Sequence, residues 1–139
     1  MRNYPEYSHG GITDSLTHCA APPLLYSHLD RMISGSNRTG AVLTLASISI
    51  SLVSGLDQIL AMAHTINQMM RKEDLCGRMG HFQFVIVISG NRADGEKLLK
   101  RIRNSTSVDF RSELVQWAAE ETSLHLLHRL DLATEISLE

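Results

Sequence analysis

The tetrapeptide Arg71–Asp74, which reads RKED, places an arginine three residues before an aspartate. The guanidinium of Arg71 can donate paired hydrogen bonds to guanine O6 and N7 or to a phosphate. The carboxylate of Asp74 can accept from guanine N1–H and from the exocyclic amine. Charge-assisted hydrogen bonds of this kind contribute about 1.5–3 kcal/mol each. The same spacing is also typical of a helix-end ion pair that contributes at most about 1 kcal/mol, and the residues alone favour this second interpretation.

The histidines and cysteines form no recognisable metal-binding or catalytic pattern. His125 and His128 lie three positions apart without a third ligand, so we expect surface histidines. Cys19 and Cys76 form no CxxC motif, which predicts neither a zinc site nor a disulfide framework. Two lone thiols are typical of a reducing cytosol, and we interpret Cys76 as a buried strand thiol.

The composition is that of one globular domain with a slightly acidic net charge. The 139 residues are 43% hydrophobic and 20% charged, which excludes global disorder. Lys and Arg total 13 against 15 Asp and Glu, and the net charge of −2 argues against a nucleic-acid partner held by bulk positive charge. The longest apolar run, Ala41–Val53, is too short to span a bilayer. We expect a cytoplasmic domain without direct membrane insertion, and a membrane-associated part of a longer protein stays open.

Hydrophobic periodicity predicts helices and strands after a short N-terminal segment. Residues 1–13 carry no periodicity and are interpreted as a tail or linker, whereas residues 14–139 form the domain. The expected elements are a helix from Pro22 to Gly35, a strand at Ala41–Leu52, a helix at Leu56–Arg71, strands at Leu75–Met79 and Phe82–Ser89, a helix at Glu96–Arg103, a strand at Phe110–Ala119 and a helix at Ser123–Ala133. This order suits an α+β, ferredoxin-like, mostly antiparallel sheet flanked by helices.

The strand expected at Phe82–Ser89 has the clearest pattern. Its residues Val85–Ile88 are apolar at consecutive positions, which predicts burial on both faces and a central place in the sheet. Gly80 and His81 precede it and are expected to form a two-residue hairpin turn. The serines that alternate along the first strand fit no Gly-x-Ser-x-Gly motif, so a nucleophilic serine is not expected.

The stretch from Arg71 to Ser89 resembles the GGDEF domain of diguanylate cyclases. In that family an RxxD motif lies five residues before a hairpin that reads Gly-Gly-Asp/Glu-Glu-Phe. Here the RxxD motif Arg71–Asp74 is followed by Leu75–Met79 and then by GHFQF. Asp14–Thr17 is similar to the DxLT start of such domains, and Leu126–Ala133 is similar to their late LLxxADxAL segment. The resemblance covers about residues 14–135 and implies the GGDEF fold, which is related to that of nucleotidyl cyclases.

The residues that carry catalysis in that family are replaced here. Family members join two GTP molecules with metal ions held by an aspartate of the first strand and by the acidic third residue of the hairpin signature. In this chain the signature positions hold Gly80, His81, Phe82, Gln83 and Phe84. Phe82 offers no oxygen, the amide of Gln83 is a poor magnesium ligand, and the first strand offers Ser47, Ser49 or Ser51. We therefore expect a degenerate domain with no catalytic residues and no metal.

The RxxD motif is intact, and in the family it forms an inhibitory site for the product, cyclic di-GMP. The resemblance therefore assigns Arg71 and Asp74 to this ligand, together with Arg101 from the helix after the hairpin. Cyclic di-GMP would be a regulatory ligand, without a further cofactor, and the signal would pass to an adjacent signalling domain or a protein partner; a homodimer is compatible with this. Two other functions stay open, a protein-interaction or scaffold module without nucleotide binding and a residual diguanylate cyclase.

Overall fold

A computed structural model describes residues 12–14, 16–51 and 55–138 of the chain. The tail or linker expected at residues 1–13 therefore falls almost wholly outside the described residues, as does Leu52 at the expected end of the first strand.

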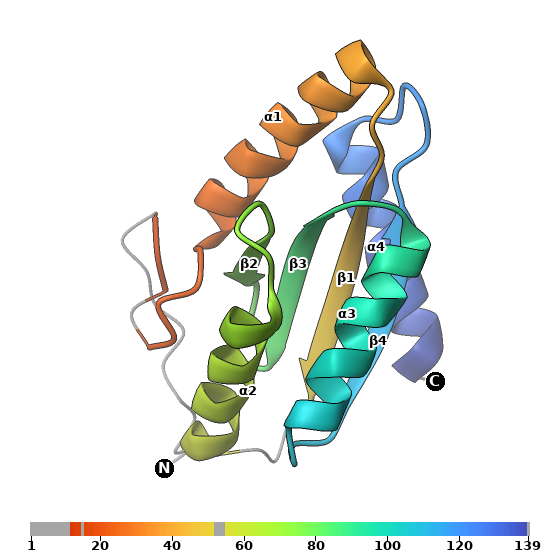
Figure 1. Cartoon of the computed structure of the whole chain (residues 1–139). Coiled ribbons are helices and arrows are strands. Elements are labelled where there is room, and N and C mark those ends of the chain that lie inside the picture. Colours follow the sequence, from red (N-terminus) through yellow and green to blue (C-terminus); the bar gives the residue numbers. More distant parts are fainter. Residues whose placement is uncertain (1–11, 15, 52–54, 139) are drawn as a thin grey trace.

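In the described part of the chain, helices and strands follow one another in the predicted order (Figure 1). The elements are α1 (Pro22–Thr39), β1 (Leu43–Ile50), α2 (Leu56–Met69), β2 (Leu75–Arg78), β3 (Gln83–Ser89), α3 (Arg92–Ser105), β4 (Phe110–Gln116) and α4 (Ser123–Leu138). Among these helices none is long and apolar enough to cross a membrane.

The four strands form one antiparallel sheet in the order β2-β3-β1-β4. The prediction that Val85–Ile88 belongs to a central strand is confirmed, because β3 lies between β2 and β1 and all four residues are buried. In the register between β3 and β1, Gln83 faces Ser49 and Val85 faces Ser47. The α+β class expected from the sequence is therefore the observed one.

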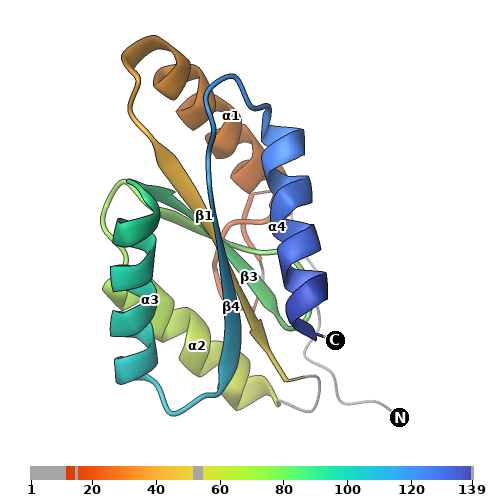
Figure 2. The same ribbon diagram turned by 90° about the vertical axis from the view of Figure 1, so that its right-hand side faces the viewer.

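Helices cover both faces of the sheet, with α2 and α3 on one face and α1 and α4 on the other (Figure 2). Alternate residues of β1 divide between the two hydrophobic cores: Ile48 packs with α2 and α3, whereas Leu45 packs with α1 and α4. By the same alternation Ser47 and Ser49 face the side of α1 and α4. A hydrogen bond of 3.1 Å between the Ser47 and Thr134 hydroxyls places Ser47 against α4.

Helix α1 is longer than predicted. Gly35 does not end it, because the buried side chains of Leu25, Leu29 and Ile33 hold the helix against the sheet and outweigh the cost of an internal glycine, about 1 kcal/mol. The helix ends at Gly40, whose φ of 79° lets its N–H donate to the Ser36 carbonyl. The helix end predicted at Gly35 was therefore wrong.

The helices α3 and α4 also extend beyond their predicted bounds. Helix α3 begins four residues before Glu96, because Asn91 caps it: the Asn91 side chain accepts from the Asp94 N–H, and the Asp94 carboxylate accepts from the Asn91 N–H. Helix α4 continues past Ala133 to Leu138. A side-chain cap therefore sets the start of α3, and hydrophobic periodicity alone did not reveal it.

The hairpin between β2 and β3 is wider than the two-residue turn expected at Gly80 and His81. Arg78 pairs with Phe84, and the Met79 N–H donates to the Gln83 carbonyl at 2.9 Å. Four residues, Met79–Phe82, therefore separate the strands. Phe82, predicted in the strand, lies in the hairpin loop.

Candidate ligand site and hairpin cleft

The RxxD motif forms the short loop between α2 and β2. Helix α2 ends at Met69, two residues before Arg71, and the Asp74 N–H then donates to the Arg71 carbonyl at 3.1 Å. The Asp74 carboxylate accepts from two backbone groups, the Arg71 N–H at 3.2 Å and the Ser89 N–H at 2.9 Å. Asp74 is only 8% exposed. The carboxylate is therefore held in one orientation between its own loop and the end of β3.

Arg71 is exposed, and its guanidinium makes no hydrogen bond or ion pair with another described residue. The helix-end ion pair considered from the sequence is absent among the described contacts, because the loop joins Arg71 and Asp74 through the backbone N–H of Arg71. The Arg71 charge thus stays available to an anion from solution.

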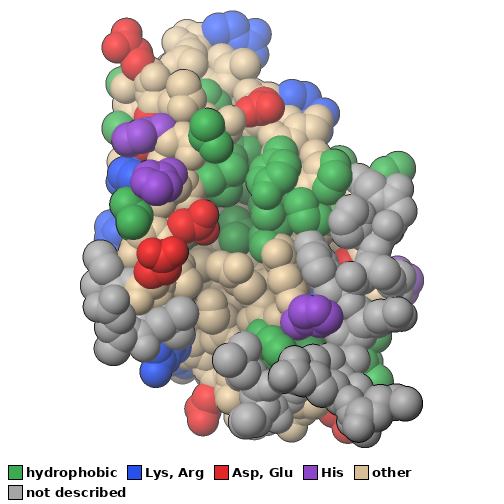
Figure 3. All heavy atoms as spheres, turned by 180° about the vertical axis from the view of Figure 1, so that it is seen from behind, with side chains coloured by type: hydrophobic (Ala, Val, Ile, Leu, Met, Phe, Trp, Pro, Cys, Tyr) green, Lys and Arg blue, Asp and Glu red, His purple; other side chains and the backbone are tan. Residues whose placement is uncertain are grey.

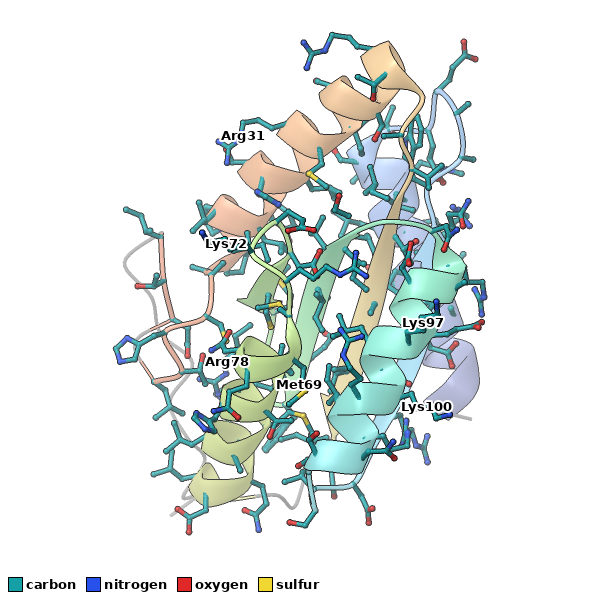
Figure 4. The ribbon with its side chains drawn as sticks, viewed as in Figure 1. Arg31, Met69, Lys72, Arg78, Lys97 and Lys100 are labelled. Carbon is teal, nitrogen blue, oxygen red and sulfur yellow. The ribbon has the colours of Figure 1, made fainter. Side chains whose placement is uncertain are left out.

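Arg101 of α3 reaches the same region. Its guanidinium donates to the Met69 carbonyl at 3.2 Å, at the C-terminal end of α2 and two residues before Arg71. Figure 4 shows Met69 on the side of α2 toward α3, whereas Lys97 and Lys100 point away from α2. The contact with Met69 gives Arg101 a fixed position beside the loop, and it offsets the partial negative charge at the helix end.

His28 of α1 is a neighbour of this loop that sequence analysis missed. Burial lowers its pKa, Arg31 lowers it further, and the nearby Asp74 carboxylate acts in the opposite direction. Its Nε2 atom is buried without a hydrogen-bond partner among the described residues. Figure 4 shows Arg31 on α1 and Lys72 on the loop on the same side of the molecule. Nothing in the helical pattern of α1 distinguished His28 from an ordinary core-facing residue.

The other end of β2 is organised by Arg78, to which the sequence analysis assigned no role. Arg78 is fully buried and forms an ion pair with the fully buried Asp14, at 3.1 Å. Its remaining donors reach the Gly80 carbonyl at 3.1 Å and the His81 carbonyl at 3.0 Å. Arg78 therefore joins the N-terminal segment to the hairpin. A charged residue between the apolar positions of a short strand was the available signal.

The Asp14 carboxylate is satisfied from two directions. The Thr17 N–H and hydroxyl donate to it at 2.8 and 2.7 Å, and Arg78 donates from the opposite side. Burial by itself raises the pKa of Asp14, but the hydrogen bonds from Thr17 and Arg78 outweigh it and lower the pKa below its ordinary value. The DxLT residues therefore act here as a structural clamp.

The hairpin between β2 and β3 borders a cleft of about 800 Å³ on the sheet face that carries α1 and α4. Its lining comes from the hairpin, the end of β1, the start of β4 and α4, and includes His81, Phe82, Gln83, Ser49, Ser51, Asp109, Arg111 and Thr134. Asp109 is the one carboxylate among the described lining residues. Figure 3 shows this side of the molecule, with hydrophobic side chains gathered in its upper half.

The predicted signature residues divide between two environments. Phe82 and Gln83 line the cleft and are half-buried, and His81 is exposed at its rim. Phe84 is fully buried in the core between the sheet and the helices α2 and α3. Ser49 of β1 pairs with Gln83 of β3, so a hydroxyl group and an amide group lie at this position of the sheet. Neither group carries the negative charge that holds magnesium.

The histidines considered for a metal belong to a different arrangement. The His125 ring contacts the carboxylate of Glu121, and Arg129 donates to the same carboxylate from Nε at 2.7 Å and Nη2 at 2.8 Å. These hydrogen bonds, chiefly from Arg129, lower the pKa of Glu121 to about 2. His128 is exposed, and the described residues contain no group of three side chains able to ligate a metal.

No protein-family model matches the sequence, and no curated protein sequence matches it. Solved structures do match. The GGDEF domain of DgcB from Caulobacter crescentus, in complex with c-di-GMP, has a TM-score of 0.84 at 18% identity and covers 99% of this chain and 93% of its own. The GGDEF domain of YfiN from Pseudomonas aeruginosa has a TM-score of 0.79 at 21% identity, over 89% of this chain and 87% of its own.

A longer protein is among the similar structures. The diguanylate cyclase SiaD from Pseudomonas aeruginosa, in complex with its activator SiaC, has a TM-score of 0.80 at 22% identity over 90% of this chain. The present chain spans only 58% of the SiaD chain. At such identities the similarity is one of fold, and the chain has the fold of a GGDEF domain.

Proposed function

We propose that this chain is a catalytically inactive GGDEF-like signalling domain that binds cyclic di-GMP at Arg71, Asp74 and Arg101. Binding would regulate an adjacent domain or a protein partner. The observation that carries the proposal is the fixed, buried Asp74 carboxylate beside the exposed Arg71, with Arg101 held two residues away at Met69. DgcB, which has the same fold, was solved with c-di-GMP bound, and this supports the class of ligand.

The chemistry of the loop suits a guanine base joined to phosphates. Each Asp74 oxygen accepts one backbone N–H, so a lone pair on each stays able to accept from guanine. Because the backbone already orients the carboxylate, little conformational entropy is lost when the ligand binds. Arg71 and Arg101 supply positive charge to the phosphates of the ligand.

Catalytic inactivity follows from the donor groups at the hairpin. Two-metal phosphoryl transfer needs anionic oxygens that hold the metal ions close to the reacting phosphate. The described lining of the cleft offers Ser49, Ser51 and Gln83 near the signature, and its one carboxylate is that of Asp109, immediately before β4. The residues present do not fit a pair of magnesium ions, so no catalytic step is assigned to them.

Isothermal titration of the protein with cyclic di-GMP tests the proposal. Arg71→Ala is expected to weaken binding about tenfold or more, because it removes a charge-assisted contact. Lys72→Ala is the matched control, since it removes the same charge from the neighbouring exposed residue, and a change of less than about threefold is expected. Absence of binding by the unmodified protein, or an equal loss in both variants, would overturn the proposed site.

A second candidate function is a protein-interaction module that binds no nucleotide. It is favoured by the contacts of Asp74, because a carboxylate that accepts from the Arg71 and Ser89 N–H groups already has a structural role. SiaD, which shares the fold, was solved with a protein activator. Capture of a partner that is independent of added cyclic di-GMP, together with no heat in the titration, would favour this function.

A further inference from the structure

Two cysteines that lie far apart in the sequence meet in the core. Cys19 belongs to the irregular segment 16–21, and Cys76 lies in β2; they are 3% and 2% exposed. The Ala20 N–H donates to the Cys76 carbonyl at 3.0 Å, and the Arg78 N–H donates to the Ala20 carbonyl at 2.9 Å. These two bonds make Ala20 and Gly77 a parallel bridge pair. At Ala20, segment 16–21 therefore pairs with the outer edge of β2.

The parallel pairing places the two cysteines side by side. Cys19 directly precedes Ala20, and Cys76 directly precedes Gly77. Cys19 and Cys76 are therefore lateral neighbours whose side chains leave the backbone on the same face. Neighbouring strands lie about 4.8 Å apart, and a disulfide spans Cα atoms about 4.4–6.8 Å apart. Both side chains pack in the core beneath α2 and α3. A hydrogen bond between the thiols lowers the pKa of Cys19 and raises that of Cys76.

We propose that Cys19 and Cys76 are a reversible redox pair, which a hydroperoxide converts into a disulfide that staples segment 16–21 to β2. The Cys19 thiolate attacks one peroxide oxygen, the O–O bond breaks, and Cys19 becomes a sulfenic acid while the other oxygen leaves as water or an alcohol. The Cys76 sulfur then attacks the sulfenic sulfur and the S–O bond breaks. The hydroxide that leaves takes up the Cys76 proton and becomes a molecule of water.

The position of each thiol assigns the order of these steps. Cys19 lies in an irregular segment held to β2 by few backbone hydrogen bonds, whereas Cys76 lies within the sheet. Local opening of segment 16–21 exposes the Cys19 sulfur without disturbing the sheet. Closure of the segment then returns the oxidised sulfur to Cys76, which is the resolving thiol.

The disulfide would restrain the strand whose two ends carry the features described above. Asp74 lies two residues before Cys76, and Arg78 lies two residues after it. In the reduced protein, Ala20 is joined to β2 by two backbone hydrogen bonds, and Asp14, which precedes segment 16–21, forms the ion pair with Arg78. A covalent bond adds a constraint that those contacts do not supply, and reduction by a dithiol removes it.

The test treats the full chain with graded hydrogen peroxide, blocks the remaining thiols after denaturation, and identifies the products by intact mass and peptide mapping. We expect the loss of two hydrogens from a monomer, a peptide that links Cys19 to Cys76, and reversal by a dithiol reductant. The oxidised protein is expected to melt about 5–15 °C higher than the reduced protein. This measurement needs no variant and does not depend on nucleotide binding.

Cys19→Ser and Cys76→Ser are the matched variants. Cys76→Ser should accumulate oxygen on Cys19, because its sulfenic acid has no resolving thiol, whereas Cys19→Ser should react more slowly. Three outcomes would overturn the proposal: peroxide adds oxygen to the unmodified protein without the linked peptide, the disulfides formed join two chains, or the linked protein melts no higher than the reduced one.

Discussion

The protein uses two nearby arginines differently: Arg78 is the last residue of β2, and Arg71 lies in the loop before β2. At the hairpin end, Arg78 is fully buried and its donors reach the Asp14 carboxylate and two hairpin carbonyls. At the RxxD end, Arg71 is exposed, and the neighbouring carboxylate is held by backbone N–H groups. One arginine is therefore satisfied within the fold, and the other is exposed to solvent. Burial and partners decide this difference, because the residue type is the same.

The largest expected effect is the loss of stability when Arg78 is removed. Arg78→Met should lower the free energy of unfolding by about 3–5 kcal/mol, because it leaves the Asp14 carboxylate buried without its partner. Arg71→Met is the matched control in the exposed loop before the same strand, and it should change stability by less than about 0.5 kcal/mol. Urea unfolding measures both. Equal effects of the two substitutions would contradict the distinction between the two arginines.

Arg129 extends the comparison to an arginine that is paired at a partly exposed position. Its partner Glu121 has a folded pKa of about 2, below the ordinary 4.5, so this pair contributes stability that is complete above about pH 4.5 and is lost as the pH falls through 2. Glu121→Gln should therefore cost about 2–3 kcal/mol at neutral pH, after allowance for the exposure of Arg129. The difference between protein and variant should shrink between pH 5 and pH 2. If the difference in the free energy of unfolding does not change with pH, the charge of Glu121 does not contribute to it.

A substitution of Arg101 tests whether this residue belongs to the proposed cyclic di-GMP site. It already donates to the Met69 carbonyl, so only part of its hydrogen-bonding capacity is free for cyclic di-GMP. Arg101→Ala should weaken binding about three- to tenfold, which is less than Arg71→Ala. Lys100→Ala, on the preceding residue of α3, is the control that removes equal charge. If calorimetric titration shows a larger loss of affinity in Lys100→Ala than in Arg101→Ala, Arg101 does not belong to the site.

The smallest expected effect concerns the synthesis of cyclic di-GMP, because no synthesis is expected before or after substitution. The protein incubated with GTP and magnesium should give no dinucleotide, and the double variant Phe82→Asp/Gln83→Glu should give none either, because Ser49 and Ser51 still supply no carboxylate from β1. Chromatography of the nucleotides measures both. Product from the unmodified protein would show that the hairpin cleft is a working catalytic site.

Hydrophobic pattern alone was sufficient to predict the order of the elements and the central place of β3. Val85–Ile88 are apolar at consecutive positions, and only a strand covered on both faces buries such a run. The ends of α1 and α3 could not be predicted in this way. Gly35 is tolerated where the neighbouring turns pack on the sheet, and Asn91 starts a helix through a capping pair that hydrophobicity does not register.

The sequence by itself determined which chemical groups the chain possesses: an arginine and a carboxylate spaced as RxxD, and a hairpin without acidic residues. Only the tertiary structure decided which of these groups are already used. Asp14 and Arg78, and likewise Cys19 and Cys76, are separated by many residues and meet because the N-terminal segment pairs with the outer edge of β2 at Ala20. Pairing between distant segments leaves no local periodicity in a sequence, since it depends on how whole elements pack against one another.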